Sequence, residues 1–83
     1  MKILYFAWLK EHTGHSSQEM QLPEGVNTVG ALIPHISKQS AGHKIALENL
    51  EAVRVAVSRV YGDLGTPVSN NDEVAFFPPV TGG

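Results

Sequence analysis

Hydrophobic and polar residues alternate in several short stretches of the chain, which is the pattern of strands that bury one face. The first stretch runs from Lys2 to Leu9 and is rich in aromatic and branched residues. The even-numbered positions of this stretch are bounded by lysines, Lys2 and Lys10, so they are predicted to face solvent. The odd-numbered positions are predicted to face the core: Ile3, Tyr5, Ala7 and Leu9. The remaining apolar side chains form a strip on the nominally wet face: Leu4, Phe6 and Trp8.

Two further strands are predicted before the end of the chain. Glu11 to Ser17, with Gly14 in the middle, predicts a turn, and residues 17–22 alternate as a second strand that forms a hairpin with the first. Residues 53–57 alternate valines with other side chains and are the most β-prone run. We therefore expect this run in the middle of the sheet, with Val53, Val55 and Val57 facing a helix.

The last alternating stretch, Val74 to Phe77, follows a tight turn predicted at Asn70-Asn71-Asp72, residue types that tolerate positive φ. Val74 and Phe76 take the core parity, and Phe77 is predicted to point outward. If the first and last strands are neighbours, the outward Phe6 and Phe77 can meet. Single surface hydrophobes are normal, but aromatic residues grouped beside a reactive chain end more often mark a protein interface. The predicted partner-binding patch contains Phe6, Trp8, Tyr61 and Phe77.

Helical spacing replaces alternation in the middle of the chain. Apolar residues recur there at i, i+3, i+4 and i+7, which predicts a helix with one face on the sheet: Val29, Leu32, Ile33 and Ile36. Asn27 or Thr28 can cap its N-terminus, and Pro34 removes one backbone hydrogen bond, so we expect a kink there.

A second helical segment is predicted after a break at Ser40 to Gly42. It covers residues 44–50 and should turn Ile45, with Leu47 or Leu50, toward the core. Residues 62–71 contain glycines and a proline and predict a loop without a helix.

The element order β-β-α-β-β predicts an α+β fold of the β-grasp, or ubiquitin-like, kind. In such a roll one main helix crosses a mixed sheet, a short second helical segment follows, and the terminal strands lie side by side. A ferredoxin-like fold is the competitor, but it needs a second full crossover helix, which residues 62–71 do not supply. We expect residues 1–77 to form the domain and residues 78–83 to form a flexible tail.

The tail begins at Pro78 and Pro79, which cannot donate hydrogen bonds to a sheet and hold the chain extended. At roughly 3 Å per residue, the tail could carry the Gly83 carboxylate about 18 Å beyond the domain. Gly82 and Gly83 have no side chain, so a narrow channel of a partner protein could close around them. Thr81 and Gly82 are the residues predicted to thread into that channel. Chain ends are commonly frayed, and that plain interpretation stays open for these residues.

Composition narrows the classes of function. The chain has 83 residues, enough for one domain, and a net charge of -2, which argues against a nucleic-acid or membrane surface. It contains no cysteine, which excludes disulfides, thiolate metal ligands and a thiol nucleophile. No apolar run approaches the ~20 residues of a membrane span, and no signal sequence is apparent, so we expect a cytoplasmic protein with protein partners.

The sequence encodes no recognisable side-chain catalysis. The histidines at positions 12, 15, 35 and 43 lack metal-ligand spacing and are expected to be solvated, and no phosphate loop is present. No metal and no bound cofactor are therefore expected. The remaining candidate for a reactive group is the Gly83 carboxylate. It is a poor electrophile until an ATP-using partner converts it to an acyl adenylate. Transfer of sulfide to that adenylate would give a thiocarboxylate.

The ending from Asp72 to Gly83 closely resembles the C-terminus of the sulfur-carrying small subunits of molybdopterin synthase, a ubiquitin-like family. The resemblance extends to Leu4-Tyr5-Phe6-Ala7, to Val29 and Leu32, and to Val55-Ala56-Val57. It is looser at Ser58-Arg59, where family members often carry Asn, and at Asn70-Asn71-Asp72, which replaces a more usual Asp-Gly-Asp turn.

This resemblance implies a role in molybdenum cofactor biosynthesis. Gly83 would be adenylated by an E1-like adenylyltransferase, sulfurated by a sulfur donor enzyme and inserted into the large subunit of the synthase. It also implies that Phe77 is an interface aromatic. Three alternatives stay open: a sulfur carrier for thiamine synthesis or transfer-RNA thiolation, a protein modifier joined to lysines through Gly83, and a plain interaction module with an incidental tail.

Overall fold

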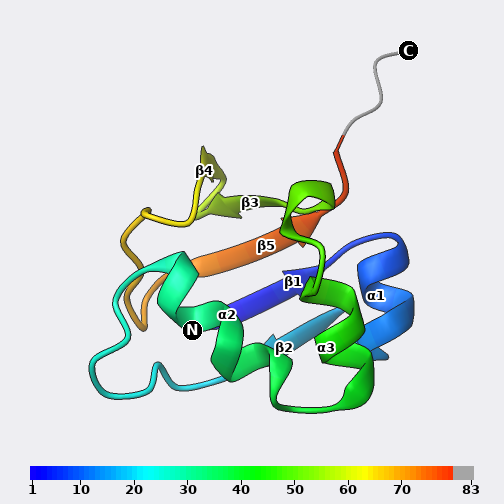
Figure 1. Ribbon diagram of the computed structural model, residues 1–83. Coiled ribbons are helices and arrows are strands. Elements are labelled where there is room, and N and C mark those ends of the chain that lie inside the picture. The colour runs from blue at the N-terminus through cyan, green and yellow to red at the C-terminus, as the bar shows by residue number, and fades with distance from the viewer. Residues whose placement is uncertain (80–83) are drawn as a thin grey trace.

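A computed structural model describes residues 1–79 of the protein (Figure 1). Its elements, in chain order, are β1 (Lys2–Tyr5), α1 (Trp8–Thr13), β2 (Ser17–Glu19), α2 (Val29–Ser37), α3 (Ala41–Leu47), the 3-10 helix η1 (Leu50–Ala52), β3 (Arg54–Val57), β4 (Val60–Gly62) and β5 (Glu73–Phe77).

The strands form one mixed sheet in the order β2-β1-β5-β3-β4. Strands β1 and β5, the first and the last, pair in parallel, whereas all the other pairs are antiparallel. The α+β β-grasp fold is therefore confirmed, including the neighbouring terminal strands. The predicted position of residues 53–57 needs one correction: β3 is an interior strand, but the middle of the sheet is β5.

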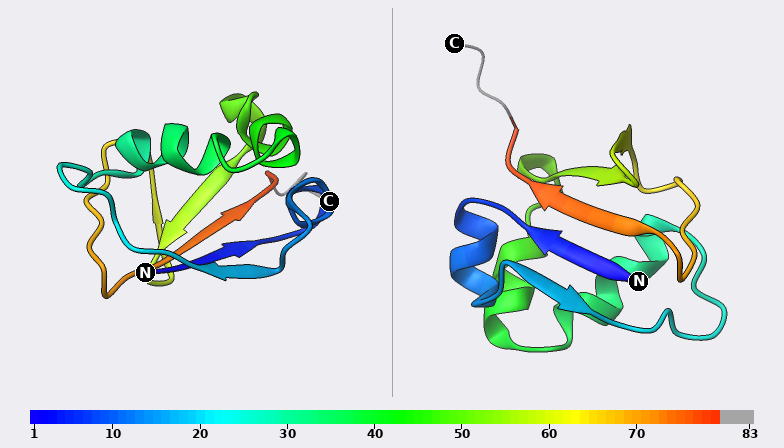
Figure 2. Two further views of the ribbon diagram at one scale, coloured as in Figure 1. Left: turned by 90° about the horizontal axis from the view of Figure 1, so that it is seen from below. Right: turned by 180° about the vertical axis from the view of Figure 1, so that it is seen from behind.

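The helices cover one face of the sheet and leave the other uncovered, as Figure 2 shows. Side chains from the covered face of the sheet and from α1, α2 and α3 make a single core, whose fully buried members include Ile3, Tyr5, Leu9, Val29, Leu32, Ile36, Val74 and Phe76. The predicted core faces of β5 and of α2 are thus confirmed. Thr28 is the N-cap of α2, accepting a hydrogen bond from the Ala31 N–H, and the helix continues through Pro34 to Ser37.

Residues 8–13 are a helix, where the sequence predicted the end of a strand and a turn. The sheet ends after Phe6, whose N–H donates to the Phe76 carbonyl, and Ala7 has φ +53°, which strand pairing does not permit. Ala7 is exposed, so its predicted core position is wrong; Leu9 is buried, but from α1. Gly14 ends α1 in the left-handed conformation, with its N–H bonded to the Lys10 carbonyl.

The second helix, α3, begins and ends earlier than predicted. Ser40 caps its N-terminus by accepting from the His43 N–H, so the predicted break at this serine is the start of the helix. The shift in register buries Leu47 and leaves Ile45 47% exposed, so the inward prediction is correct for Leu47 and wrong for Ile45. Leu50 is also exposed, at the start of η1.

Strand β4 was not predicted. It follows a two-residue turn at Ser58 and Arg59, both of which have positive φ, as hairpin turns that match the twist of a sheet require. The tight turn predicted at Asn70-Asn71-Asp72 is present: it closes with the Asp72 N–H bonded to the Ser69 carbonyl, and its residues have negative φ.

A partly buried polar network joins the covered face of the sheet to α3. Tyr5 donates to Oε1 of Gln18 at 2.7 Å, and the same oxygen lies 3.0 Å from Nε2 of His43, whose Nδ1 lies 2.7 Å from the Ser40 hydroxyl. His43 is 3% exposed, so the expectation that it is solvated is wrong. Burial, and then the neighbouring His15, lower the pKa of His43 below its ordinary 6.5, so the neutral ring is favoured in the folded chain.

This network predicts a stability that falls in mild acid. Below pH 6.5 His43 is mostly protonated in the unfolded chain, whereas in the folded chain, where its pKa is lower, it stays neutral to lower pH. The free energy of unfolding should therefore fall as pH is lowered from about 7.5 to about 5. Melting curves across that range should show the decline, and His43→Gln should flatten it. Equal pH slopes for the two proteins would show that His43 is not the group responsible.

The two phenylalanines of β5 should differ sharply in their effect on folding. Phe76 is 1% exposed in the core, so Phe76→Ala should lower the free energy of unfolding by roughly 3 to 5 kcal/mol. Phe77 is half-buried on the uncovered face, and Phe77→Ala should cost about 1 kcal/mol. Urea denaturation of both variants measures the difference, and similar losses would contradict the assigned faces.

Candidate functional site

The predicted reactive end of the chain lies outside the described residues, which include Pro78 and Pro79 but not Thr81, Gly82 or Gly83. Strand β5 ends at Phe77, as predicted, so the tail leaves the domain from the middle strand of the sheet. The site that the structure does describe is the surface around this exit.

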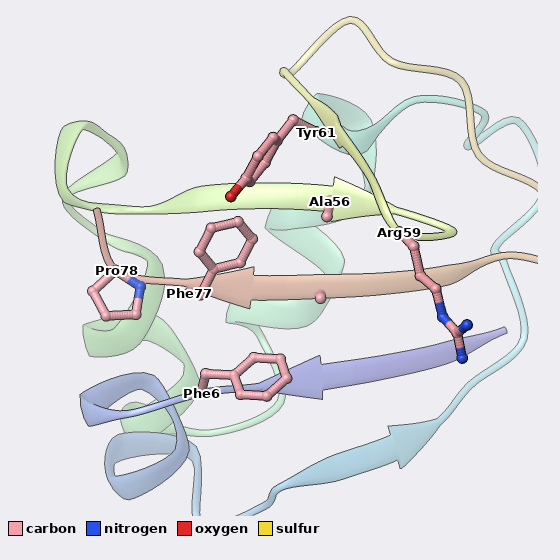
Figure 3. A pocket seen from close by; sticks show the side chains of 7 residues that line it. Phe6, Ala56, Arg59, Tyr61, Phe77 and Pro78 are labelled. Atoms are coloured by element: carbon pink, nitrogen blue, oxygen red, sulfur yellow. The ribbon is translucent and has the colours of Figure 1, made fainter. Parts of the chain in front are cut away.

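A groove of about 510 Å³ opens on the uncovered face of the sheet, beside the exit of the tail (Figure 3). We call it the outer-face groove. Its lining comes from the end of β1, from β3, β4 and β5, and from the β3–β4 turn: Phe6, Ala56, Arg59, Tyr61, Ala75, Phe77 and Pro78.

Strand register explains why this face is hollow. Ala75 lies opposite Leu4 on one side and Ala56 on the other, and Ala56 lies opposite Tyr61, so four strands contribute one row of side chains. The two alanines are too small to fill the space between the neighbouring aromatic rings and so form the floor of the groove. Tyr61 and Phe77 form part of its wall, with ring centroids 5.8 Å apart and planes tilted by 47°.

The walls are apolar and open to solvent. Phe6 is 48% exposed and Tyr61 is 78% exposed, although both rings are large and could have been buried. Phe77 and Pro78 complete this apolar surface at the point where the tail begins. Contiguous exposed aromatic surface of this kind marks a protein-binding site more often than a chance feature.

Three of the four patch residues predicted from the sequence, Phe6, Tyr61 and Phe77, do line one groove. Trp8 does not. It lies in α1, half-buried against the core, and its ring meets that of His12 edge to face at 6.2 Å. The prediction failed for Trp8 because it assumed that the strand continues past Phe6, whereas the chain turns into a helix there.

Sequence reasoning missed Ala56, Ala75 and Arg59. The alternation of β5 could have placed Ala75 beside Phe77 on the outer face. The position of Arg59 depends on the unpredicted β3–β4 turn, and nothing in its neighbours along the chain indicated it.

The base of that turn is held by Asp72. Its carboxylate accepts hydrogen bonds from the Ser58 hydroxyl at 2.8 Å and from the Ser69 N–H at 2.8 Å. These bonds, that from Ser58 first, hold the pKa of Asp72 below its usual value. The Ser58 N–H also donates to the Glu73 carbonyl at 2.7 Å, so the turn is fixed to the start of β5.

The chemistry available in the groove is that of binding. Its polar side chains are those of Tyr61 and Arg59, and no other side chain from residues 1–79 brings a carboxylate, imidazole or amine to its lining. Among residues 1–79 no group of His, Asp and Glu side chains could hold a metal ion. Within the same range no helix is long and apolar enough to cross a membrane.

Comparison with known proteins gives full-length similarity. The ThiS family model matches residues 3–83. The chain is 39% identical to the molybdopterin synthase sulfur carrier subunit of Escherichia coli strain K12, covering 100% of this chain and 99% of that protein. It is 35% identical, over the same shares of the two chains, to the protein of that name from Haemophilus influenzae.

A solved structure has the same fold. The crystal structure of SAMP1 from Haloferax volcanii superimposes with a TM-score of 0.73 and 28% identity, covering 100% of this chain and 98% of that one. The resemblance seen at the C-terminus of the sequence therefore extends over the whole chain, and the protein belongs to the ThiS family, as a full-length relative of the molybdopterin synthase sulfur carrier subunits.

Proposed function

We propose that this protein carries sulfur for molybdopterin synthesis in the cytoplasm, with Gly83 as the residue that bears the sulfur. The observation that carries the proposal is the full-length similarity to molybdopterin synthase sulfur carrier subunits, which includes the Gly-Gly end. The geometry supports it, since the described residues offer an apolar groove next to the start of the tail.

The proposed chemistry needs two steps at the Gly83 carboxylate. An E1-like adenylyltransferase would transfer AMP from ATP to the carboxylate and release pyrophosphate. The carbonyl then carries AMP, which is a good leaving group. A sulfur donor enzyme would then supply sulfide, which displaces AMP and gives a thiocarboxylate. Inside the large synthase subunit, the thiocarboxylate would give its sulfur to the pterin precursor, and the carboxylate would be regenerated with an oxygen from water.

The outer-face groove is the proposed docking surface for these partners. It adjoins Pro78, so a partner seated on Phe6, Tyr61 and Phe77 would receive the tail directly. The activating enzyme and the large subunit would use the same surface in turn. Their binding would then be mutually exclusive, which suits a carrier that is charged, released and discharged.

Removal of Gly83 should abolish sulfur transfer without affecting folding. A terminal glycine buries no apolar surface, so melting of the shortened chain should be unchanged. With activating enzyme, ATP and sulfide, intact-mass measurement should show the full chain exchanging one oxygen for sulfur and the shortened chain unmodified. Cofactor synthesis supported by the shortened chain would refute the proposal.

Phe77→Ala and Phe6→Ala should weaken docking to the large subunit by roughly 2 kcal/mol each, because aromatic anchors dominate the energy of many interfaces. Isothermal titration calorimetry measures the loss, and Ile45→Ala is the matched control, since Ile45 is as exposed as Phe6 but lies on α3. Undiminished affinity of both phenylalanine variants, with native-like melting, would mean that the groove is not the docking site.

Protein modification is the second candidate, favoured by the similarity to SAMP1, a small archaeal modifier protein. The same activated Gly83 could acylate a lysine amine of a target protein in place of sulfide. Mass spectrometry of cell extracts separates the two uses: a thiocarboxylate on the free chain supports sulfur carriage, and isopeptides between Gly83 and lysines support modification.

A further inference from the structure

Arg59 is the one charged residue among those that line the outer-face groove. Its guanidinium forms no hydrogen bond or ion pair with any residue in the described range 1–79, whereas that of Arg54 donates to the Glu51 and Val53 carbonyls. Figure 3 shows the Arg59 side chain reaching from the β3–β4 turn across β5 in the direction of β1. A cation is thus held at the end of an apolar groove opposite Pro78.

The backbone holds Arg59 in this place at a cost to the turn. Its φ of +72° is one that Gly or Asn adopts far more readily than Arg. The preceding Ser58 is tied to Asp72 and to the Glu73 carbonyl, so the turn cannot easily move. A strained residue whose side chain has no partner within the domain suggests a role outside it.

We propose that Arg59 is a specificity-determining residue that binds a carboxylate of the large subunit when that subunit occupies the groove. The inference rests on the proposed function and adds the chemistry of the partner segment: an apolar side chain over the floor formed by Ala56 and Ala75, with an Asp or Glu next to it. The planar guanidinium suits a carboxylate, with which it makes paired hydrogen bonds.

Charge on this face of the sheet favours an acidic group from outside. Glu73 is a carboxylate to consider, because it lines a smaller hollow together with Arg59, Ser58 and Asn71. It lies opposite Lys2 in the parallel β1–β5 register, so it has a cationic neighbour of its own. Within residues 1–79 no acidic side chain lines the groove itself, so Arg59 makes the groove side of the turn positive.

Binding of the large subunit to the full chain tests the proposal, measured as association and dissociation rates at several salt concentrations. Arg59→Asn should weaken binding about fivefold, mostly through slower association, and flatten its salt dependence. Arg59→Lys keeps the charge and should keep the salt dependence, while Arg59→Glu should weaken binding more than Arg59→Asn does. Lys44→Asn removes a positive charge from an exposed position on α3, away from the groove, and should change affinity less than twofold.

Melting separates this role from a structural one. Asn fits positive φ better than Arg, so Arg59→Asn should melt at the same temperature as the original chain or higher, while binding becomes weaker. Wild-type affinity and salt dependence in Arg59→Asn would overturn the inference, and if Phe77→Ala still weakened docking the proposed function would stand. A change in self-association of the free chain on Arg59→Asn would make the occupant a second copy and would also overturn it.

Discussion

Strand β5 is bonded in parallel to β1 and antiparallel to β3, and the rest of the structure depends on this double pairing. Its alternation sends Val74 and Phe76 into the core and Ala75 and Phe77 to the outer face. One short strand therefore fixes the centre of the core, the floor of the groove and the origin of the tail. A register slip of one residue would exchange the two faces and lose all three together.

The two faces of the sheet have different surroundings. The covered face packs against the helices and carries the network of Tyr5, Gln18, His43 and Ser40. Throughout the described residues, every buried side-chain nitrogen or oxygen has a hydrogen-bond partner. The outer face carries exposed aromatic rings and a cation with no partner in residues 1–79. Substitutions on the outer face can therefore alter recognition while the core stays intact.

Regular elements could be predicted from the sequence wherever a long apolar pattern decided the structure. The faces of α2 and β5 followed from periodicity, and so did the meeting of Phe6 and Phe77 once the terminal strands were neighbours. Helix α1 could not be predicted because it is short and begins with an aromatic residue that favours strands. It is stabilised by tertiary packing on α3, where a side chain at Gly42 would overlap the His12 carbonyl oxygen.

The remaining misses share one physical cause, which is that distant partners decided them. His43 is buried because Gln18, on β2, supplies the acceptor that a buried imidazole needs. Arg59 lies at the groove because Asp72 holds the turn from the far end of the loop that follows β4. The tail, by contrast, could be interpreted from its residues alone, and comparison with known proteins then placed the whole chain in one family.

The parallel pairing of β1 with β5 also determines when the outer-face groove can form. A ribosome makes β1 (Lys2–Tyr5) well before β5 (Glu73–Phe77), so the contact between them spans a large separation in sequence and must wait until β5 has been made. The walls of the groove come from both ends, with Phe6 after β1 and Phe77 at the end of β5. A chain that stops before Phe77 therefore lacks one wall of the groove, however well the rest of the chain is formed.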